Sequence, residues 1–160
     1  MLSGVLLVQL GAVASSNFIW STDYLKNEIE RAVKCQWEGT GSVISCPVRK
    51  ISGTISLSKK ESSKDADSIE IIGLLMESPR DSSAEDISKD TIFEVFNKIF
   101  PKKNLNLAPL QEAFHEAEDT EENIIFEIDD VSVSVQKIQP ADLEDYYIDI
   151  LLTRKMGESK

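Results

Sequence analysis

Few side chains in this sequence have the type and spacing that catalysis or metal binding requires. The single histidine, His115, lies on the polar side of a predicted helix over Leu110–Ala117. A zinc site needs further Cys or His ligands at close spacing, and His115 has none beside it. The sequence also lacks a phosphate loop, an HExxH motif, a nucleophile elbow and a dinucleotide fingerprint. We therefore predict no catalytic residue, no cofactor-binding residue and no metal ligand.

An acidic run lies at the end of this predicted helix and could attract a hard cation. Calcium loops place their ligands in an alternating D-x-D-x-D-G pattern, which is absent here. We interpret the run as a solvated helix end followed by a hairpin turn. Its members are Glu116, Glu118, Asp119, Glu121, Glu122, Asp129 and Asp130.

The two cysteines, Cys35 and Cys46, have ten residues between them, too many for a CxxC redox motif. In an oxidising compartment a disulfide would tie the end of the first helix to the first strand. The chain-entropy model gives such a loop about 2–3 kcal/mol of stabilisation. In a reducing compartment the two would be buried apolar thiols. We predict the disulfide, with Trp37 packed over it or on the rim of the core.

The N-terminal segment Met1–Ala14 is predicted to be a secretory signal peptide. Its apolar run, Val5–Leu10, leads into Ala12-Val13-Ala14, the small-x-small pattern of a cleavage site. No Lys or Arg precedes Lys26, so either the α-amino group supplies the only positive charge or the true start lies upstream. The alternative interpretation is a buried N-terminal helix or strand in a cytoplasmic protein. No apolar run reaches the roughly 18 residues that span a bilayer, so no membrane span is expected.

The composition limits which classes of molecule this chain is expected to bind. The chain has 160 residues and a net charge of −11, a length typical of one domain. Binding to nucleic acid or to an anionic membrane requires clustered Lys and Arg, so neither is expected. An acidic surface favours solubility and can also steer a basic partner toward it.

Hydrophobic periodicity predicts a single α+β domain over residues 22–156. Helices are expected from Thr22 to Gln36, with Gly39–Gly41 as the stop, over Ser88–Phe100, and from Pro109 to Ala117. Strands are expected near Val43–Val48, Ile51–Ser58, Ile69–Met76, Ile124–Ile128, Val131–Gln136 and Tyr146–Thr153, with polar loops at Lys59–Ser68 and Ser78–Asp86.

These elements repeat in order. A helix, a two-strand ribbon, a polar loop and a strand occur from Tyr24 to Met76 and again from Leu110 to Thr153. The repeat is open to two explanations, duplication or convergent patterning. In both cases we expect an antiparallel sheet covered by helices on one face, built from two helix-plus-three-strand units.

Two likenesses bear on function, although neither rests on a motif. A small acidic chain that mixes helices and antiparallel strands resembles type III secretion chaperones, which end in a helix where this chain ends in a strand. A repeated helix-plus-strands unit in an exported chain resembles secreted protease or lactamase inhibitors.

The functional hypothesis is an exported, periplasmic or extracellular, non-enzymatic module that binds a protein partner with a basic surface. It would use the exposed sheet face or the loops Lys59–Ser68 and Ser78–Asp86. The alternatives are a cytoplasmic acidic chaperone or adaptor acting as a dimer, and an unrecognised enzyme.

Overall fold

A computed structural model describes residues 18–76, 82–101, 105–141 and 146–154. The predicted signal peptide, Met1–Ala14, lies outside the described residues, as does part of the predicted loop Ser78–Asp86. For residues 74–76 and 82–86 only the backbone is described. For all other residues in the four ranges above, the side chains are described as well.

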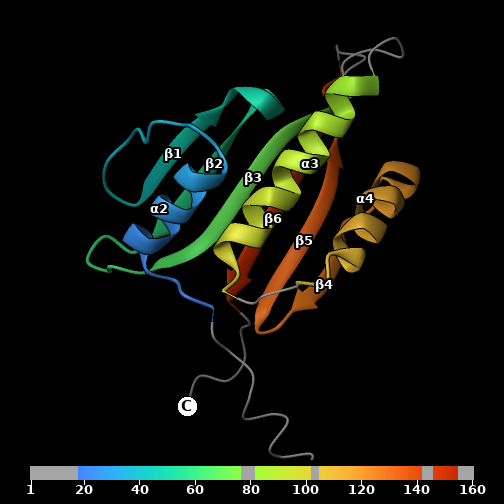
Figure 1. The fold of residues 1–160 in the computed structure, drawn as a ribbon. Coiled ribbons are helices and arrows are strands. Elements are labelled where there is room, and N and C mark those ends of the chain that lie inside the picture. The colour runs from blue at the N-terminus through green and yellow to red at the C-terminus, as the bar shows by residue number, and fades with distance from the viewer. Residues whose placement is uncertain (1–17, 77–81, 102–104, 142–145, 155–160) are drawn as a thin grey trace, which may run out of the picture.

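The described elements are three α-helices, one short 3-10 helix and six strands. In the sheet the strand order is β1-β2-β3-β6-β5-β4, and every neighbouring pair is antiparallel. This confirms the predicted α+β class (Figure 1). The elements are α2 (Thr22–Ala32), β1 (Val43–Val48), η1 (Arg49–Ile51), β2 (Gly53–Lys59), β3 (Ala66–Met76), α3 (Ser82–Ile99), α4 (Ala108–Thr120), β4 (Ile124–Ile128), β5 (Val131–Ile138) and β6 (Tyr146–Arg154).

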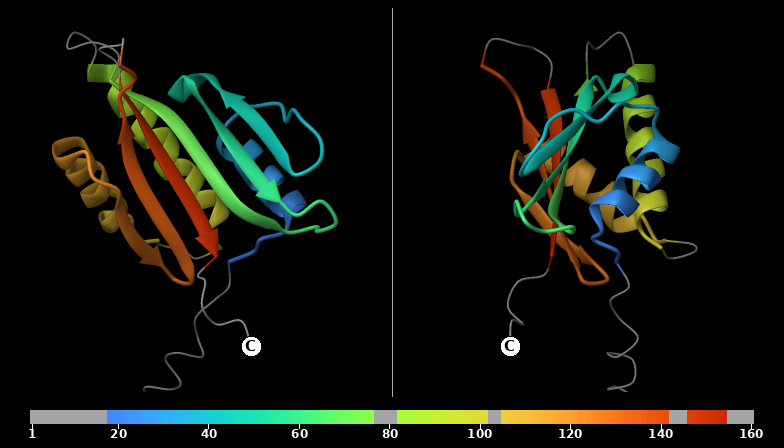
Figure 2. Two further views of the ribbon diagram at one scale, coloured as in Figure 1. Left: turned by 180° about the vertical axis from the view of Figure 1, so that it is seen from behind. Right: turned by 90° about the vertical axis from the view of Figure 1, so that its left-hand side faces the viewer.

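All three α-helices lie on one side of the sheet, and the views from behind and from the side show the other side without a helix (Figure 2). Strand alternation fits this arrangement, because every second residue is buried. In β5, for example, Val131, Val133 and Val135 are fully buried while the residues between them are not. The buried residues form one continuous cluster whose largest members include Phe96, Phe100, Phe114, Leu25 and Ile29.

The two predicted helix-plus-three-strand units are α2-β1-β2-β3 and α4-β4-β5-β6. Within each unit the strands pair in chain order, and the units join where β3 pairs with β6. Helix α3 connects the units in the chain and packs against α2 and β3 (Figure 1). The centre of the sheet is therefore the β3–β6 pair, which places the third strand of each unit beside its counterpart.

Helix α2 begins at Thr22, as expected, but ends earlier than expected. Ser21 caps its start, since the Ser21 hydroxyl accepts a hydrogen bond from the Tyr24 amide, and Thr22 lies inside the helix and is buried. The helix ends at Ala32 and not at Gln36. Residues after Ala32 run extended along the outer side of β1, where Glu38 bridges Ser45. That backbone pairing, together with a disulfide, replaces the last helical turn that the periodicity predicted.

The first hairpin also differs from its prediction. Ile51 belongs to η1 and not to a strand, so β1 and β2 are two strands joined by a 3-10 turn. The predicted loop Lys59–Ser68 is present but shorter, because β2 continues to Lys59 and β3 begins at Ala66, which leaves residues 60–65 as the connection. A bulge at this end accommodates the change of register.

Helix α3 begins at Ser82, six residues before the predicted start at Ser88.

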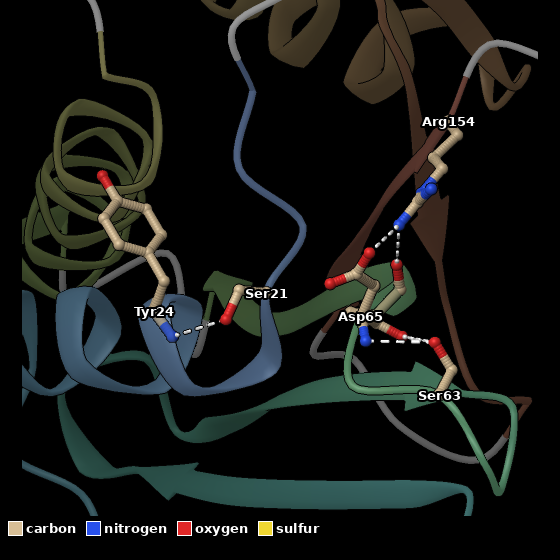
Figure 3. Close-up of polar contacts among 6 residues, drawn as sticks. Ser21, Tyr24, Ser63, Asp65 and Arg154 are labelled. Carbon is tan, nitrogen blue, oxygen red and sulfur yellow. Dashed lines mark hydrogen bonds and ion pairs between the residues drawn. The ribbon is translucent and has the colours of Figure 1, made fainter.

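The turn between β2 and β3 is fixed by contacts with distant segments (Figure 3). Arg154, at the end of β6, lies 3.5 Å from a carboxylate oxygen of Asp65 and donates to the carbonyl of Ala66. The Asp65 amide in turn donates to the hydroxyl of Ser63. This turn therefore holds the two units together at one end of the β3–β6 pair.

Candidate functional site

The side of the sheet without a helix, here called the open face, is the broadest described surface with a distinct composition. The open face is formed by every second residue of the six strands, those that alternate with the buried core residues. Cross-strand register arranges these residues in rows. One row contains four hydroxyl residues on four neighbouring strands, Ser58, Ser68, Thr153 and Ser132.

Two carboxylates lie at the centre of this face. Glu70 of β3 is paired with Leu151 of β6, and Asp149 of β6 is paired with Ile72 of β3. Glu70 and Asp149 are thus diagonal neighbours on the same face of adjacent antiparallel strands, a spacing that long side chains can bridge. Both are partly buried.

Burial and the neighbouring acid together raise the pKa of Asp149. Desolvation of the Asp149 carboxyl, followed by repulsion from Glu70 and a hydrogen bond with it, raises the pKa of Asp149 to about 6. Oδ1 of Asp149 is buried without a hydrogen-bond partner. A protein chain gains no stability from this arrangement, because two carboxylates are held close together and one is partly desolvated.

Large apolar side chains flank the acidic pair on the β5–β4 side. Leu151 is 37% exposed and its cross-strand neighbour on β5 is Ser134, which is itself paired with Ile125 of β4. Ile125 is 65% exposed, more than any other large hydrophobic residue the structure describes. Ile138 of β5 is also exposed. A monomer commonly exposes single apolar residues, but here Leu151 and Ile125 lie in one cross-strand row with Glu70, separated from each other by Ser134.

Positive charge is missing from the open face. Among the described strand residues, Lys137 and Arg154 lie at alternating positions that face the helices. Lys59 is paired with the fully buried Ala66, so it also lies on the helix side. Glu127 of β4 adds a third carboxylate to the open face. The face therefore combines carboxylates, hydroxyls and exposed apolar groups, and no Lys or Arg of the described strands points to it.

The structure contains the predicted disulfide between Cys35 and Cys46, with the two Cα atoms 5.6 Å apart. It ties the extended segment after α2 to β1, and not the helix end itself as predicted. Trp37 is half-buried and packs against the core, while its Nε1 is buried without a hydrogen-bond partner. The disulfide is structural in position, because it lies on the helix side of β1 and away from the open face: Cys46 is fully buried.

The other residues considered from sequence are not brought together. His115 is exposed on α4. In the acidic run, Glu118 pairs with Lys89 at 3.1 Å and Glu121 with Lys137 at 3.6 Å, so these two carboxylates connect α4 to α3 and β5. In the ranges the structure describes, no group of three or more His, Cys, Asp or Glu side chains could hold a metal ion.

Sequence reasoning did not identify Glu70 and Asp149 as a pair. A signal was present, because Glu70 and Asp149 each lie between two isoleucines in the third strand of their unit, and the segments Ile69-Glu70-Ile71 and Ile148-Asp149-Ile150 correspond in the repeat. What the sequence did not supply was the pairing of β3 with β6, which brings the two acids to one place.

Comparison with protein-family models, with curated proteins and with solved structures finds no significant match to this chain. No described helix is long and apolar enough to cross a membrane. The function is therefore argued from the open face itself.

Proposed function

We propose that this chain is an exported, non-enzymatic protein that binds another protein through the open face of its sheet, and that the bound surface of the partner is basic. The observation that carries the proposal is that the exposed Leu151 lies directly opposite Glu70 of the acidic pair, with the exposed Ile125 further along the same cross-strand row. A partner that covered this face would bury apolar area and gain attraction from the carboxylates at the same time.

The cost of the acidic pair supports a role in binding. Partial burial of Asp149 and repulsion from Glu70 disfavour the ionised form of Asp149. A Ser or Thr at either position would continue the hydroxyl rows without that cost. A lysine or arginine from a partner would relieve both effects, since it would compensate the charge and supply a donor to the unpartnered Oδ1 of Asp149.

Two features support the proposal that the chain is exported: the Cys35–Cys46 disulfide and the N-terminal cleavage pattern. Disulfides persist in oxidising compartments and are rare in the cytoplasm of most organisms. The alternative of a cytoplasmic adaptor that dimerises through an apolar strand face gains no support from these features, because it needs reduced cysteines and a face without crowded acids.

The test compares two doubly substituted chains as immobilised baits in an extract from the native source. E70Q/D149N removes two charges from the open face, and E112Q/E116Q removes two charges from exposed positions of α4. Both change the net charge from −11 to −9, two units each. We expect a basic protein to be retained by the wild type and by E112Q/E116Q, and to be lost from E70Q/D149N.

Retention should also depend on salt. Exposed charges interact over about 30 Å at 0.01 M salt and about 8 Å at 0.15 M, so retention should weaken steeply over this range. A partner retained equally by both substituted chains, or one that is lost equally from both, would contradict a binding role for the open face.

A further inference from the structure

A second feature of the molecule lies away from the open face. A cavity of about 890 Å³ is lined by the end of α2, by the extended segment that follows it, and by the residues from Pro47 to Lys50 at the end of β1 and the start of η1. In Figure 1 this is the region where the chain leaves α2 and passes around the outer side of β1. The volume is within the range of small-molecule sites, about 300–1,000 Å³.

The lining of this cavity is basic although the chain as a whole is strongly acidic. Four cationic residues and two carboxylates, those of Glu30 and Glu38, line the cavity. The lining therefore has a net charge of +2. The whole chain has 17 basic and 28 acidic residues. The cationic residues are Arg31, Lys34, Arg49 and Lys50.

Three of the four cations have no ion-pair partner among the described residues. Arg31 pairs with Glu28 at 3.0 Å, whereas Lys34, Arg49 and Lys50 form no ion pair and no side-chain hydrogen bond there. A basic residue at the end of a helix is explained by attraction to the helix dipole, and this accounts for Arg31. It does not account for Arg49 and Lys50, which come from a separate element on the opposite wall.

We propose that this cavity binds a small polyanion that carries phosphate or sulfate ester groups. The Arg49 guanidinium can donate two parallel hydrogen bonds to the oxygens of one tetrahedral oxyanion, and the Lys34 and Lys50 ammonium groups supply point charges from both walls. Because the surrounding surface is acidic, a ligand with several anionic groups confined to the cavity fits better than an extended polyanion.

The disulfide fixes one wall of this site. Cys35 lines the cavity, and its bond to Cys46 of β1 holds the segment that carries Lys34 against the strand that leads to Arg49. The two basic walls are thereby held at a set separation without a ligand. This preorganisation reduces the ordering that binding would otherwise require.

The test is a titration of the oxidised, isotopically labelled chain followed by two-dimensional NMR at constant ionic strength. The probes are inorganic pyrophosphate, sucrose octasulfate and, as an uncharged control, sucrose. We expect saturable shifts of backbone amides in residues 31–36 and 47–51, with a dissociation constant below about 1 mM for at least one polyanion and none for sucrose.

Two charge-matched variants separate a site from general attraction. R49Q/K50Q removes two cations from the cavity, and K60Q/K64Q removes two exposed cations from the turn between β2 and β3. We expect the first to raise the dissociation constant about tenfold or more, because charge-assisted hydrogen bonds are lost, and the second to leave it nearly unchanged. K34Q tests the opposite wall should R49Q/K50Q fail to fold. No saturable shift with either polyanion, or equal weakening by both double variants, would overturn the proposal.

Discussion

At the scale of single residues, the molecule is defined by charges in unusual places. Asp149 and Glu70 bring negative charge to the centre of a sheet, while Lys34, Arg49 and Lys50 gather unpaired positive charge at its edge. Neither group is required by packing, because the core consists of apolar residues on the other side of the strands. The acidic pair has a cost of burial and repulsion that a partner could offset, whereas the three cations are exposed to solvent.

The stability of the folded chain should depend on the ionisation of Asp149. Its pKa is raised from 3.8 to about 6 in the folded state, so the folded chain binds this proton more readily than the unfolded chain. The contribution to stability is fully present below the unfolded pKa of 3.8 and is lost as the pH rises through about 6.

Asp149→Asn should therefore stabilise the fold at neutral pH. Because solvent screens this partly exposed pair, we expect a gain of only about 1 kcal/mol in the free energy of unfolding near pH 7.5, with the gain vanishing below the unfolded pKa. Urea unfolding at several pH values measures it. Asp67→Asn, at an exposed position of β3, is the matched control and should show no such pH-dependent gain. A constant difference between D149N and wild type at all pH values would contradict the assignment.

At the scale of elements, periodicity predicted the types of the described helices and strands, while long-range pairing decided their ends. The alternation in β5 and the helical spacing of α4 are strong local signals, and both elements lie where they were expected. Helix α2 stops at Ala32 because the following residues pair with β1 and are held by Cys35, which local spacing does not encode. The acidic pair was missed for the same reason, since it depends on β3 lying beside β6.

Removal of the disulfide should loosen one element and leave the rest of the fold in place. The Cys35–Cys46 link closes a loop with a sequence separation of 11, so C35A/C46A should lose about 2–3 kcal/mol of stability in the chain-entropy model. Thermal unfolding measures the loss. Hydrogen exchange should increase in residues 33–42 and stay unchanged in β5. Reduction of the wild type should reproduce both effects, whereas an unchanged melting temperature would show that the link does not constrain the chain.

At the scale of the whole molecule, the helices and the open face have separate roles. Helices α2, α3 and α4 cover one side of the sheet and enclose the core, and no helix of the described residues covers the other side (Figure 2). The net charge of −11 sets what can approach that side. A copy of the same chain would bring like charges together, while a basic protein would be attracted.

The chain should accordingly be monomeric. Face-to-face association would place the Glu70–Asp149 pair of one copy near the acids of another, and such juxtaposition is costly. We expect sedimentation equilibrium to give the monomer mass at about 100 μM, well above the dissociation constants of specific dimers. A dimer that Leu151→Asp abolishes would instead favour the adaptor that dimerises through its strand face.

The central claim is that the open face binds a basic protein, and the most direct test is a comparison of affinities for the retained partner. Calorimetric titration at low salt would give dissociation constants for wild type, E70Q/D149N and E112Q/E116Q. We expect E70Q/D149N to weaken binding about tenfold or more while E112Q/E116Q remains close to wild type, because only the first removes charge that the partner contacts. Equal dissociation constants for the two variants would contradict the claim.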